Sequence, residues 1–157
     1  MLANNNLCPC GSGNIYSDCC EKIILTTAKA ASPEQLMRSR YSAYFFKNED
    51  YLLKSWYHST RPKSLQLNND TTKWKRLRII FAKENIVHFV AYFSDLNHPG
   101  KTLYALNEES EFINENGEWF YLAGKNLSSG EISKNMQCPC ASGKKFKRCC
   151  LPLIDTD

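Results

Sequence analysis

The eight cysteines constrain this chain of 157 residues more than any other feature, because all of them fall into two short stretches near its ends. The first stretch, residues 8–20, has the sequence CPCGSGNIYSDCC, and the second, residues 138–150, has the sequence CPCASGKKFKRCC. Each consists of C-P-C, eight intervening residues and C-C, and the long segment between them contains no cysteine. The chain therefore carries one small unit twice, far apart, and is not a solenoid of stacked repeats.

Four thiols that arrive as two close pairs favour a metal site over disulfides. A disulfide within Cys-Pro-Cys or between adjacent cysteines closes a small, strained ring, and nothing in the sequence directs the chain to an oxidising compartment. Four sulfur ligands suit tetrahedral Zn²⁺ in a closed structural site, whereas iron–sulfur clusters usually draw on more widely spaced ligands. We therefore predict two zinc ions, one per cluster. The predicted ligands are Cys8, Cys10, Cys19 and Cys20 in the first cluster and Cys138, Cys140, Cys149 and Cys150 in the second.

The turn that follows each Cys-Pro-Cys is expected to need residues that tolerate a positive φ. Pro9 and Pro139 stiffen the chain between the paired sulfurs, and Gly11 and Gly13 let backbone N–H groups fold over the thiolates. Ala141 stands where Gly11 stands in the first copy. We therefore expect this turn to be slightly less favourable in the second copy.

Both stretches resemble the SEC-C motif, a zinc knuckle also found at the C-terminal end of the SecA preprotein-translocase ATPase. The second differs from the common form CPCGSGKKFKKCC mainly at Ala141, whereas the first lacks the basic run. Two such knuckles around the segment MRSRYSAY, residues 37–44, resemble the YchJ-like family of uncharacterised bacterial proteins. Further matches are Trp56, Thr60-Arg61-Pro62, Glu109-Ser110-Glu111-Phe112 and Gly117 with Trp119-Phe120-Tyr121. The resemblance covers nearly the whole chain and implies the same eight zinc ligands, but it implies no reaction.

Charge distinguishes the two cysteine clusters. The chain has a formal net charge of +4, and each zinc ion with four thiolates contributes about −2, so a globally basic nucleic-acid binder is not supported. The second cluster nevertheless contains four cations, Lys144, Lys145, Lys147 and Arg148, whereas the first contains only Asp18. These cations either screen the anionic metal centre or contact an acidic partner. Because the SecA knuckle helps to bind a chaperone and is linked to ribosome contact, the resemblance implies docking to a protein or to a ribosomal or nucleic-acid partner.

The segment between the clusters is predicted to contain two helices followed by four antiparallel strands. Ser32 and Pro33 begin the first helix with a capping box closed by Gln35, and Asn48 caps a second helix over residues 49–57 with Trp56 inward. The apolar period then changes to two. The strands are expected at residues 76–81, 86–93, 102–114 and 118–123, with turns at 83–85, 97–100 and 115–117.

This plan, with 43% hydrophobic and 23% charged residues, is typical of a small α+β domain with a core. A curved sheet wrapped on helices resembles the nuclear-transport-factor-2-like, cystatin-like fold, which the family resemblance also implies. Residues 21–31 and 125–135 are expected to be links. We therefore divide the chain into a knuckle at 1–22, a central domain at 23–127, and a linker with the second knuckle at 128–157.

The central domain offers no catalytic constellation. It has no nucleophile–base spacing, phosphate-binding glycine loop or paired-acid motif, so no catalytic residue is predicted. His88 is expected on a half-buried strand face with one hydrogen bond. Glu109 and Glu111 share one strand face, which is expected to meet solvent, and Arg38 or Arg40 is expected to pair with one of them. Trp56, Trp74 and Trp119 are expected in the core.

The leading interpretation is a zinc-binding adaptor that docks through its knuckles, and two alternatives stay open. A pocket in the central domain, common in folds of this kind, would bind a small apolar ligand or serve an isomerase or dehydratase. The basic setting around Cys149 and Cys150 would suit a redox switch in which oxidation releases zinc. The segment MLANNNLCPC lacks the features of a secretory signal, and no long apolar run is present. We therefore expect a cytoplasmic protein without membrane contact.

Overall fold

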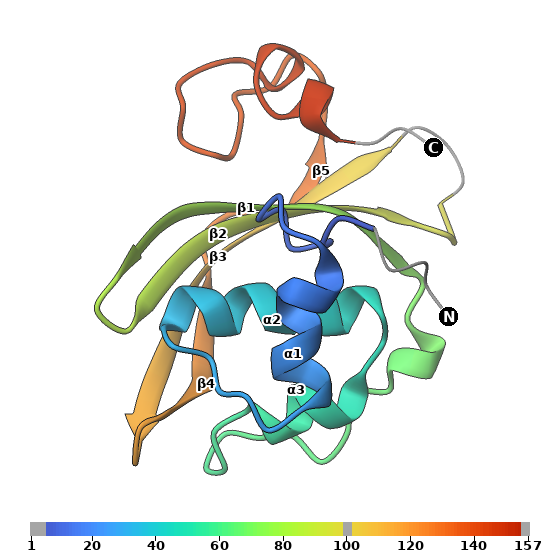
Figure 1. The fold of residues 1–157 in the computed structure, drawn as a ribbon. Helices are drawn as coiled ribbons and strands as arrows, with labels where there is room; N and C mark the ends of the chain where they lie inside the picture. Colours follow the sequence, from blue (N-terminus) through green and yellow to red (C-terminus); the bar gives the residue numbers. More distant parts are fainter. Residues whose placement is uncertain (1–5, 99–101, 155–157) are drawn as a thin grey trace.

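The computed structural model describes residues 6–98 and 102–154. A strongly curved antiparallel sheet lies at the centre, with helices against its concave face and the second cysteine cluster on the opposite face (Figure 1). The α-helices of the described residues are α1 (Cys20–Leu25), α2 (Pro33–Phe45) and α3 (Glu49–Lys54). The strands are β1 (Thr72–Lys83), β2 (Ile86–Asp95), β3 (Leu103–Glu115), β4 (Glu118–Asn126) and β5 (Gly130–Ile132). This order of helices before antiparallel strands confirms the predicted α+β plan. None of the described helices is long and apolar enough to cross a membrane.

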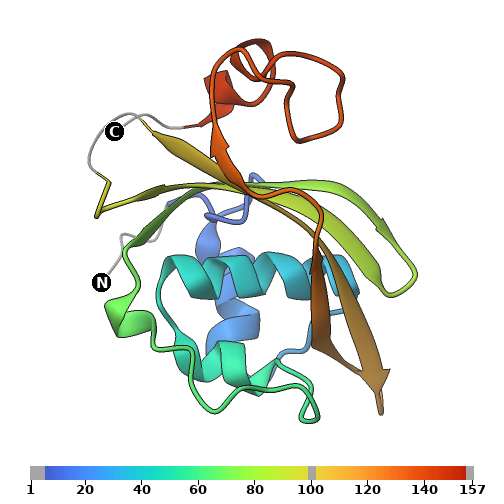
Figure 2. The same cartoon turned by 180° about the vertical axis from the view of Figure 1, so that it is seen from behind.

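Helix α2 begins as the sequence predicts. Ser32 Oγ accepts a hydrogen bond from the Gln35 amide at 3.2 Å, and Pro33 occupies the first turn. The Gln35 side chain accepts from the amide of Ala31, one residue before the cap, at 2.6 Å. These bonds satisfy amides that the start of a helix leaves without partners. They fix the start of the helix that lies across the concave face of the sheet (Figure 2).

The sheet follows the chain as a meander, in the order β1-β2-β3-β4, with β5 paired to β3. The predicted turn at residues 83–85 joins β1 to β2, and the predicted hairpin at 115–117 joins β3 to β4. Asn116 and Gly117 have φ values of 53° and 80°, the left-handed geometry that tight hairpin turns require. The turn predicted at 97–100 lies partly outside the described residues.

Strand β2 is buried on both faces. Val87, Phe89 and Ala91 belong to the core formed with the helices, whereas Val90 and Tyr92 pack with the second cysteine cluster. A strand covered on both sides is apolar at nearly every position, which explains the sequence IVHFVAYF of residues 86–93. The sheet therefore needs a cover on each face.

Two predicted links contain regular structure. Residues 20–25 form α1, with Ile23 buried in the main core, where a link was expected over 21–31. The expected linker over 125–135 includes the end of β4 and strand β5, whose Ile132 pairs with Leu103 of β3. Both predictions were wrong for the same reason, because each segment carries an apolar residue that a packed neighbour buries.

Helix α3 is shorter than predicted. It ends at Lys54 because the chain then pairs with β4: the Tyr57 amide donates to the Tyr121 carbonyl at 2.8 Å, and the Tyr121 amide donates to the Ser55 carbonyl at 2.9 Å. Trp56 is half-buried beside this bridge, with its ring 4.8 Å from that of Tyr121. The predicted cap is confirmed, since Asn48 Oδ1 accepts from the Tyr51 amide at 3.0 Å.

Arg40 lies inside the core, not in the predicted pair with Glu109 or Glu111. Its side chain is 2% exposed, and Nη1 donates to the Leu52 carbonyl at 2.8 Å and to Ser55 Oγ at 2.7 Å. Its guanidinium carbon lies 5.1 Å from the ring centre of Trp56 and 4.5 Å from that of Tyr121. Burial lowers the pKa of Arg40 from its usual value. This guanidinium therefore joins α2, α3 and β4 through hydrogen bonds and ring contacts.

Replacing Arg40 with alanine is expected to destabilise the central domain by about 3 kcal/mol, since two buried acceptors lose their donor and a void remains. Urea unfolding of the metal-loaded protein measures this change. Lys63→Ala, at an exposed position, is the control and is expected to stay within about 0.5 kcal/mol of the parent. Equal unfolding midpoints for the two variants would contradict the role given to Arg40.

Candidate metal centres

The structure brings all eight predicted ligands together in two groups of four. Within each group the sulfur atoms lie within 4.8 Å of one another. In the first group the Cys10 and Cys19 sulfurs are 3.7 Å apart and the Cys19 and Cys20 sulfurs 3.8 Å apart. In the second group the two corresponding distances are 3.4 and 4.0 Å. A tetrahedral zinc ion with Zn–S bonds of about 2.3 Å places its ligands about 3.8 Å apart, so both groups fit a four-coordinate metal.

The two clusters share one backbone scaffold. A bridge joins Leu7 to Ile15 in the first cluster and Gln137 to Lys145 in the second. The amide of the leading cysteine then donates across the loop, from Cys8 to the Asn14 carbonyl at 2.7 Å in the first copy. The equivalent bond in the second copy, Cys138 to Lys144, is 2.8 Å long. A short 3₁₀ turn before each C-C pair, at Tyr16–Asp18 and Phe146–Arg148, presents the last two sulfurs.

A serine hydroxyl lies against the half-buried sulfur of each cluster. Ser12 Oγ is 3.3 Å from Cys19 Sγ, and Ser142 Oγ is 3.1 Å from Cys149 Sγ. A hydroxyl can donate to a thiolate, and such donors help to orient metal ligands and balance their charge. The serine of the CPCxSG sequence therefore contacts a candidate ligand sulfur in both copies.

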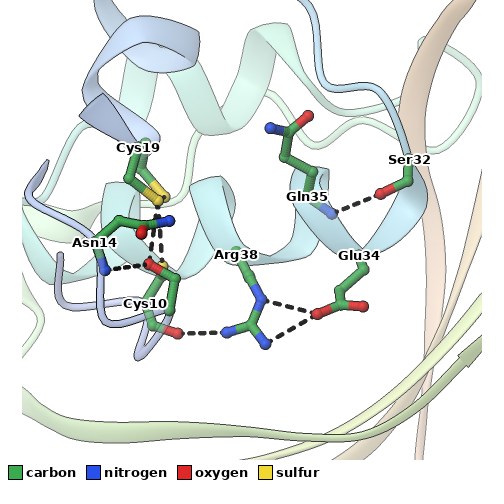
Figure 3. A network of polar contacts seen from close by, with 9 residues as sticks. Cys10, Asn14, Cys19, Ser32, Glu34, Gln35 and Arg38 are labelled. Atoms are coloured by element: carbon green, nitrogen blue, oxygen red, sulfur yellow. Dashed lines mark hydrogen bonds and ion pairs between the residues drawn. The ribbon is translucent and has the colours of Figure 1, made fainter. Parts of the chain in front are cut away.

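The first cluster is attached to α2 on the helical side of the sheet. Ser42 Oγ lies 3.6 Å from Cys8 Sγ. Arg38 Nη1 donates to the Cys10 carbonyl at 2.8 Å, and the same guanidinium pairs with Glu34 at 2.9 Å (Figure 3). Arg38 therefore faces the metal centre, and not Glu109 or Glu111 as was predicted. The contact orients the Cys-Pro-Cys turn from an adjacent helix.

The second cluster is attached directly to the outer face of the sheet. The Tyr92 hydroxyl lies 3.6 Å from Cys138 Sγ, and Arg78 Nη1 donates to Cys150 Sγ at 3.4 Å. The ring of Phe146 stacks on that of Tyr92 with centroids 5.5 Å apart. A guanidinium beside an anionic metal–thiolate centre is electrostatically favourable. The sequence pattern did not indicate Arg78 and Tyr92, since only the register of β1 and β2 places them under the knuckle.

The turns after the two Cys-Pro-Cys segments differ as expected, because both need a positive φ but only the first has glycine there. Gly11 has φ of 74°, and Ala141 has φ of 61° at the equivalent position. A Cβ on Gly11 would also lie 3.2 Å from the Leu77 carbonyl of β1, whereas Ala141 is exposed. Glycine is therefore needed for both backbone geometry and space in the first copy, but the second copy accommodates alanine with some strain.

Without a metal, contacts between the thiols of each cluster change their pKa values. In the first cluster, hydrogen bonds from Cys10 and Cys20 lower the pKa of Cys8, whereas contact with Cys10 and Cys8 raises that of Cys20. The pKa of Cys10 rises to about 11: the contact with Cys20 lowers it, but the contact with Cys8 and burial outweigh that effect.

The second cluster shows the same pattern of one lowered pKa and two raised ones. Burial raises the pKa of Cys140, but hydrogen bonds from Ser142 and neighbouring thiols bring it down to about 6. The pKa of Cys150 rises to about 12, chiefly through burial. Contact with Ser142 lowers the pKa of Cys149, but burial and the neighbouring thiols raise it overall. Each cluster therefore has one thiol with a lowered pKa, Cys8 or Cys140, beside two thiols whose pKa values are raised.

Three predictions about other residues are also resolved. His88 is half-buried and has one hydrogen bond, from its Nε2 to Asn107 Oδ1 at 2.8 Å, as predicted. Glu109 is half-buried, whereas Glu111 is exposed. Trp74 packs against the main core, as predicted. The prediction that Lys144, Lys145, Lys147 and Arg148 either screen the metal centre or contact an acidic partner stays open, and all four are exposed on the second knuckle.

Comparison with known sequences agrees with this geometry at both ends and in the middle. The SEC-C motif matches residues 5–22 and 135–152, and the YchJ middle NTF2-like domain matches residues 32–124. The chain belongs to the YchJ family. A UPF0225 protein of Enterobacter sp. strain 638 is 41% identical over 154 residues, covering 92% of this chain and 97% of the relative. The YchJ match also confirms the NTF2-like fold predicted for the central domain.

Two solved structures resemble this YchJ-family protein. One is a SEC-C motif protein from Rhodopseudomonas palustris, with a TM-score of 0.68 and 30% identity; the match covers 78% of this chain and all of that one. The other is a SEC-C motif protein from Psychrobacter arcticus, with a TM-score of 0.61 and 25% identity, covering 96% and 98% of the two chains. Most of the fold of this chain is therefore shared with two SEC-C motif proteins of known structure.

The difference between the two turns predicts opposite effects of exchanging their residues. Gly11→Ala is expected to weaken metal retention at the first site by about 1–2 kcal/mol, because it adds a left-handed alanine and a close contact. Ala141→Gly is expected to strengthen the second site by up to about 1 kcal/mol. Chelator competition followed by native mass spectrometry measures metal loss from each variant. Equal loss from Gly11→Ala and the parent would contradict this explanation.

Metal binding is expected to release at least two protons per ion near neutral pH, because Cys10 and Cys20 in the first cluster and Cys149 and Cys150 in the second have raised pKa values without metal. Since protons compete with the metal for the thiolates, affinity is expected to fall as the pH falls. Calorimetry in buffers of different ionisation enthalpy counts the released protons. A binding enthalpy independent of the buffer would show that the thiols are already ionised.

Proposed function

We propose that this protein is a docking adaptor, in which zinc holds the second knuckle in shape and the knuckle presents a basic surface to an acidic partner protein. The observation that carries the proposal is the exposure of Lys144, Lys145, Lys147 and Arg148. No ion pair within residues 6–98 and 102–154 uses any of these side chains. We call these four cations the basic surface.

The basic surface carries more charge than its metal centre needs. Four cations exceed the net charge of about −2 of a zinc ion with four thiolates. Arg78, which lies under the knuckle and not in the basic surface, already donates to Cys150 Sγ at 3.4 Å. The four outer cations are therefore available to an anionic partner, and screening of the metal alone does not account for all of them.

The first knuckle provides an internal comparison. At the positions of Lys144, Lys145, Lys147 and Arg148 it has Asn14, Ile15, Ser17 and Asp18. Asp18 pairs with Lys22 of α1 at 3.1 Å, so the acidic end of this knuckle already faces a cation of the same chain. The shared scaffold with different surfaces supports a structural role for the first knuckle and a docking role for the second.

The second knuckle is also held in a defined orientation. Strand β5 pairs with β3 and leads directly to it, and Phe146 is 1% exposed against Tyr92. A fixed patch loses less conformational freedom on binding than a patch on a flexible tail. This attachment favours recognition of a partner with a matching arrangement of carboxylates.

Replacing the four residues of the basic surface with glutamine is expected to weaken binding to an acidic partner at least about tenfold at low salt, while zinc content and fold are retained. The test compares cross-linked partners of parent and variant proteins in bacterial extract, and then titrates the purified partner. A matched control replaces Lys54, Lys63, Lys83 and Lys125, four exposed lysines elsewhere, with glutamine. Recovery of the same partners by both variants would contradict the assignment, and selective loss of ribosomes would identify nucleic acid or ribosomal protein instead.

A further inference from the structure

A cavity of about 240 Å³ lies between α2 and the concave face of the sheet, apart from both cysteine clusters. Its walls are mostly apolar and include Tyr44, Trp74, Phe89 and Leu106. The side chains of α2 that line it recur at helical spacing, from Met37 to Tyr44, so one face of the helix forms one wall. A cavity of about 150 Å³ can bind benzene, and this larger space fits two fused rings.

One end of the cavity contains a carboxylate held in place. Glu108 lines the cavity, and Ser110 Oγ donates to Glu108 Oε1 at 2.8 Å. A Cβ on Gly124 would overlap the Glu108 carboxylate, so the absence of a side chain on β4 makes room for it. A carboxylate only accepts hydrogen bonds. A ligand group that suits this end therefore carries an O–H or N–H donor.

Arg40 provides the opposite charge in the same cavity wall. Its Nη1 is occupied by the Leu52 carbonyl and Ser55 Oγ, and its guanidinium lies against the Trp56 and Tyr121 rings. Arg40 forms no ion pair with a carboxylate in the described part of the chain. The cavity therefore contains one cation and one anion, and the combination favours a ligand without net charge.

The cavity walls also contain two polar groups without a partner. The Tyr41 hydroxyl and Trp74 Nε1 are buried, and neither has a hydrogen-bond partner; both residues line the cavity, and Tyr41 is 2% exposed. Buried groups of this kind are rare in native proteins, and an unoccupied ligand site is one explanation for them. A ligand oxygen near Tyr41 and Trp74 would supply the missing acceptor.

The strand register separates these two ends. Trp74 pairs with Phe93, and Glu108 pairs with Phe89, so they face positions four residues apart on β2, or about 13 Å along the strand. We propose that the cavity binds a neutral, two-ring aromatic compound with a hydroxyl or N–H donor for Glu108 at one end and an oxygen acceptor near Tyr41 and Trp74 at the other. This site is independent of the docking surface on the second knuckle.

The probe for this proposal is 6-acetyl-2-naphthol, which has a donor and an acceptor at opposite ends of two fused rings. Its methoxy analogue keeps the rings and the acceptor but lacks the donor. Fluorescence titration of both compounds against the full-length, metal-loaded protein measures their affinities. We expect the hydroxyl compound to bind at least about tenfold more tightly, because it alone donates to a carboxylate.

Two adjacent glutamates provide a matched pair of variants. Glu108→Gln is expected to reduce the preference for the hydroxyl compound to less than about threefold, because a neutral amide accepts more weakly than a carboxylate. Glu109 is on the same strand but does not line the cavity, so Glu109→Gln is expected to keep the full preference. Both substitutions remove one negative charge.

Ala91→Leu tests the location of the site, since Ala91 lines the cavity and is 1% exposed. It is expected to weaken both probes at least about tenfold by filling space, with NMR spectra and metal content confirming the fold. Absence of binding to the parent protein would overturn the proposal. So would equal affinity for the two probes, or equal effects of Glu108→Gln and Glu109→Gln. If Ala91→Leu does not fold, the comparison of Glu108→Gln with Glu109→Gln tests the proposed site by itself.

Discussion

The fold depends on covering both faces of one curved sheet, and a cysteine cluster takes part in each cover. On the concave side the helices form the main core, and the first cluster is joined to α2 through Ser42 and Arg38. On the other side Val90 and Tyr92 have the second cluster as their cover. A segment this short has little core of its own, so its shape depends on the sulfur-bound ion. Metal coordination and burial of the sheet are therefore parts of the same folding reaction.

This dependence changes the meaning of the duplicated motif. A zinc knuckle is often regarded as an appendage with its own partner, but both copies here contact the central domain through groups that reach their sulfur atoms. Arg78 and Tyr92 do this from the sheet, and Ser42 does it from a helix. The two copies differ in what they expose to solvent, because the first presents Asp18 and the second presents the basic surface. The two copies thus share a scaffold and differ in their surface properties.

Much of this arrangement could be predicted from local patterns. Cysteine spacing was sufficient to predict which four sulfur atoms lie together in each group, because the geometry of a four-sulfur site acts over a few residues. Capping by Ser32 and Asn48 and the turn at Asn116 and Gly117 are equally local. The missed features depend on contacts between distant segments: α1 and β5 are short, and tertiary neighbours stabilise them.

The charged residues show the same limit of prediction. The alternation along β3 indicated Glu109 and Glu111 as the acidic residues that share one strand face. The structure instead places Glu108 in the wall of the cavity. One of Arg38 and Arg40 was predicted to pair with Glu109 or Glu111, whereas Arg40 bonds to a carbonyl and a hydroxyl and lies against two aromatic rings. Such partners cannot be inferred from spacing, because each comes from a segment whose position is set by the complete fold.

The place of the second cluster on the sheet also has a consequence for cells short of metal. A chain that lacks this ion would lose the cover over Val90 and Tyr92, and the strand face exposed in this way is apolar. Surfaces of this kind attract other unfolded chains and the proteases and chaperones that remove them. The abundance of the protein would then follow the supply of metal, through quality control and without a dedicated sensor.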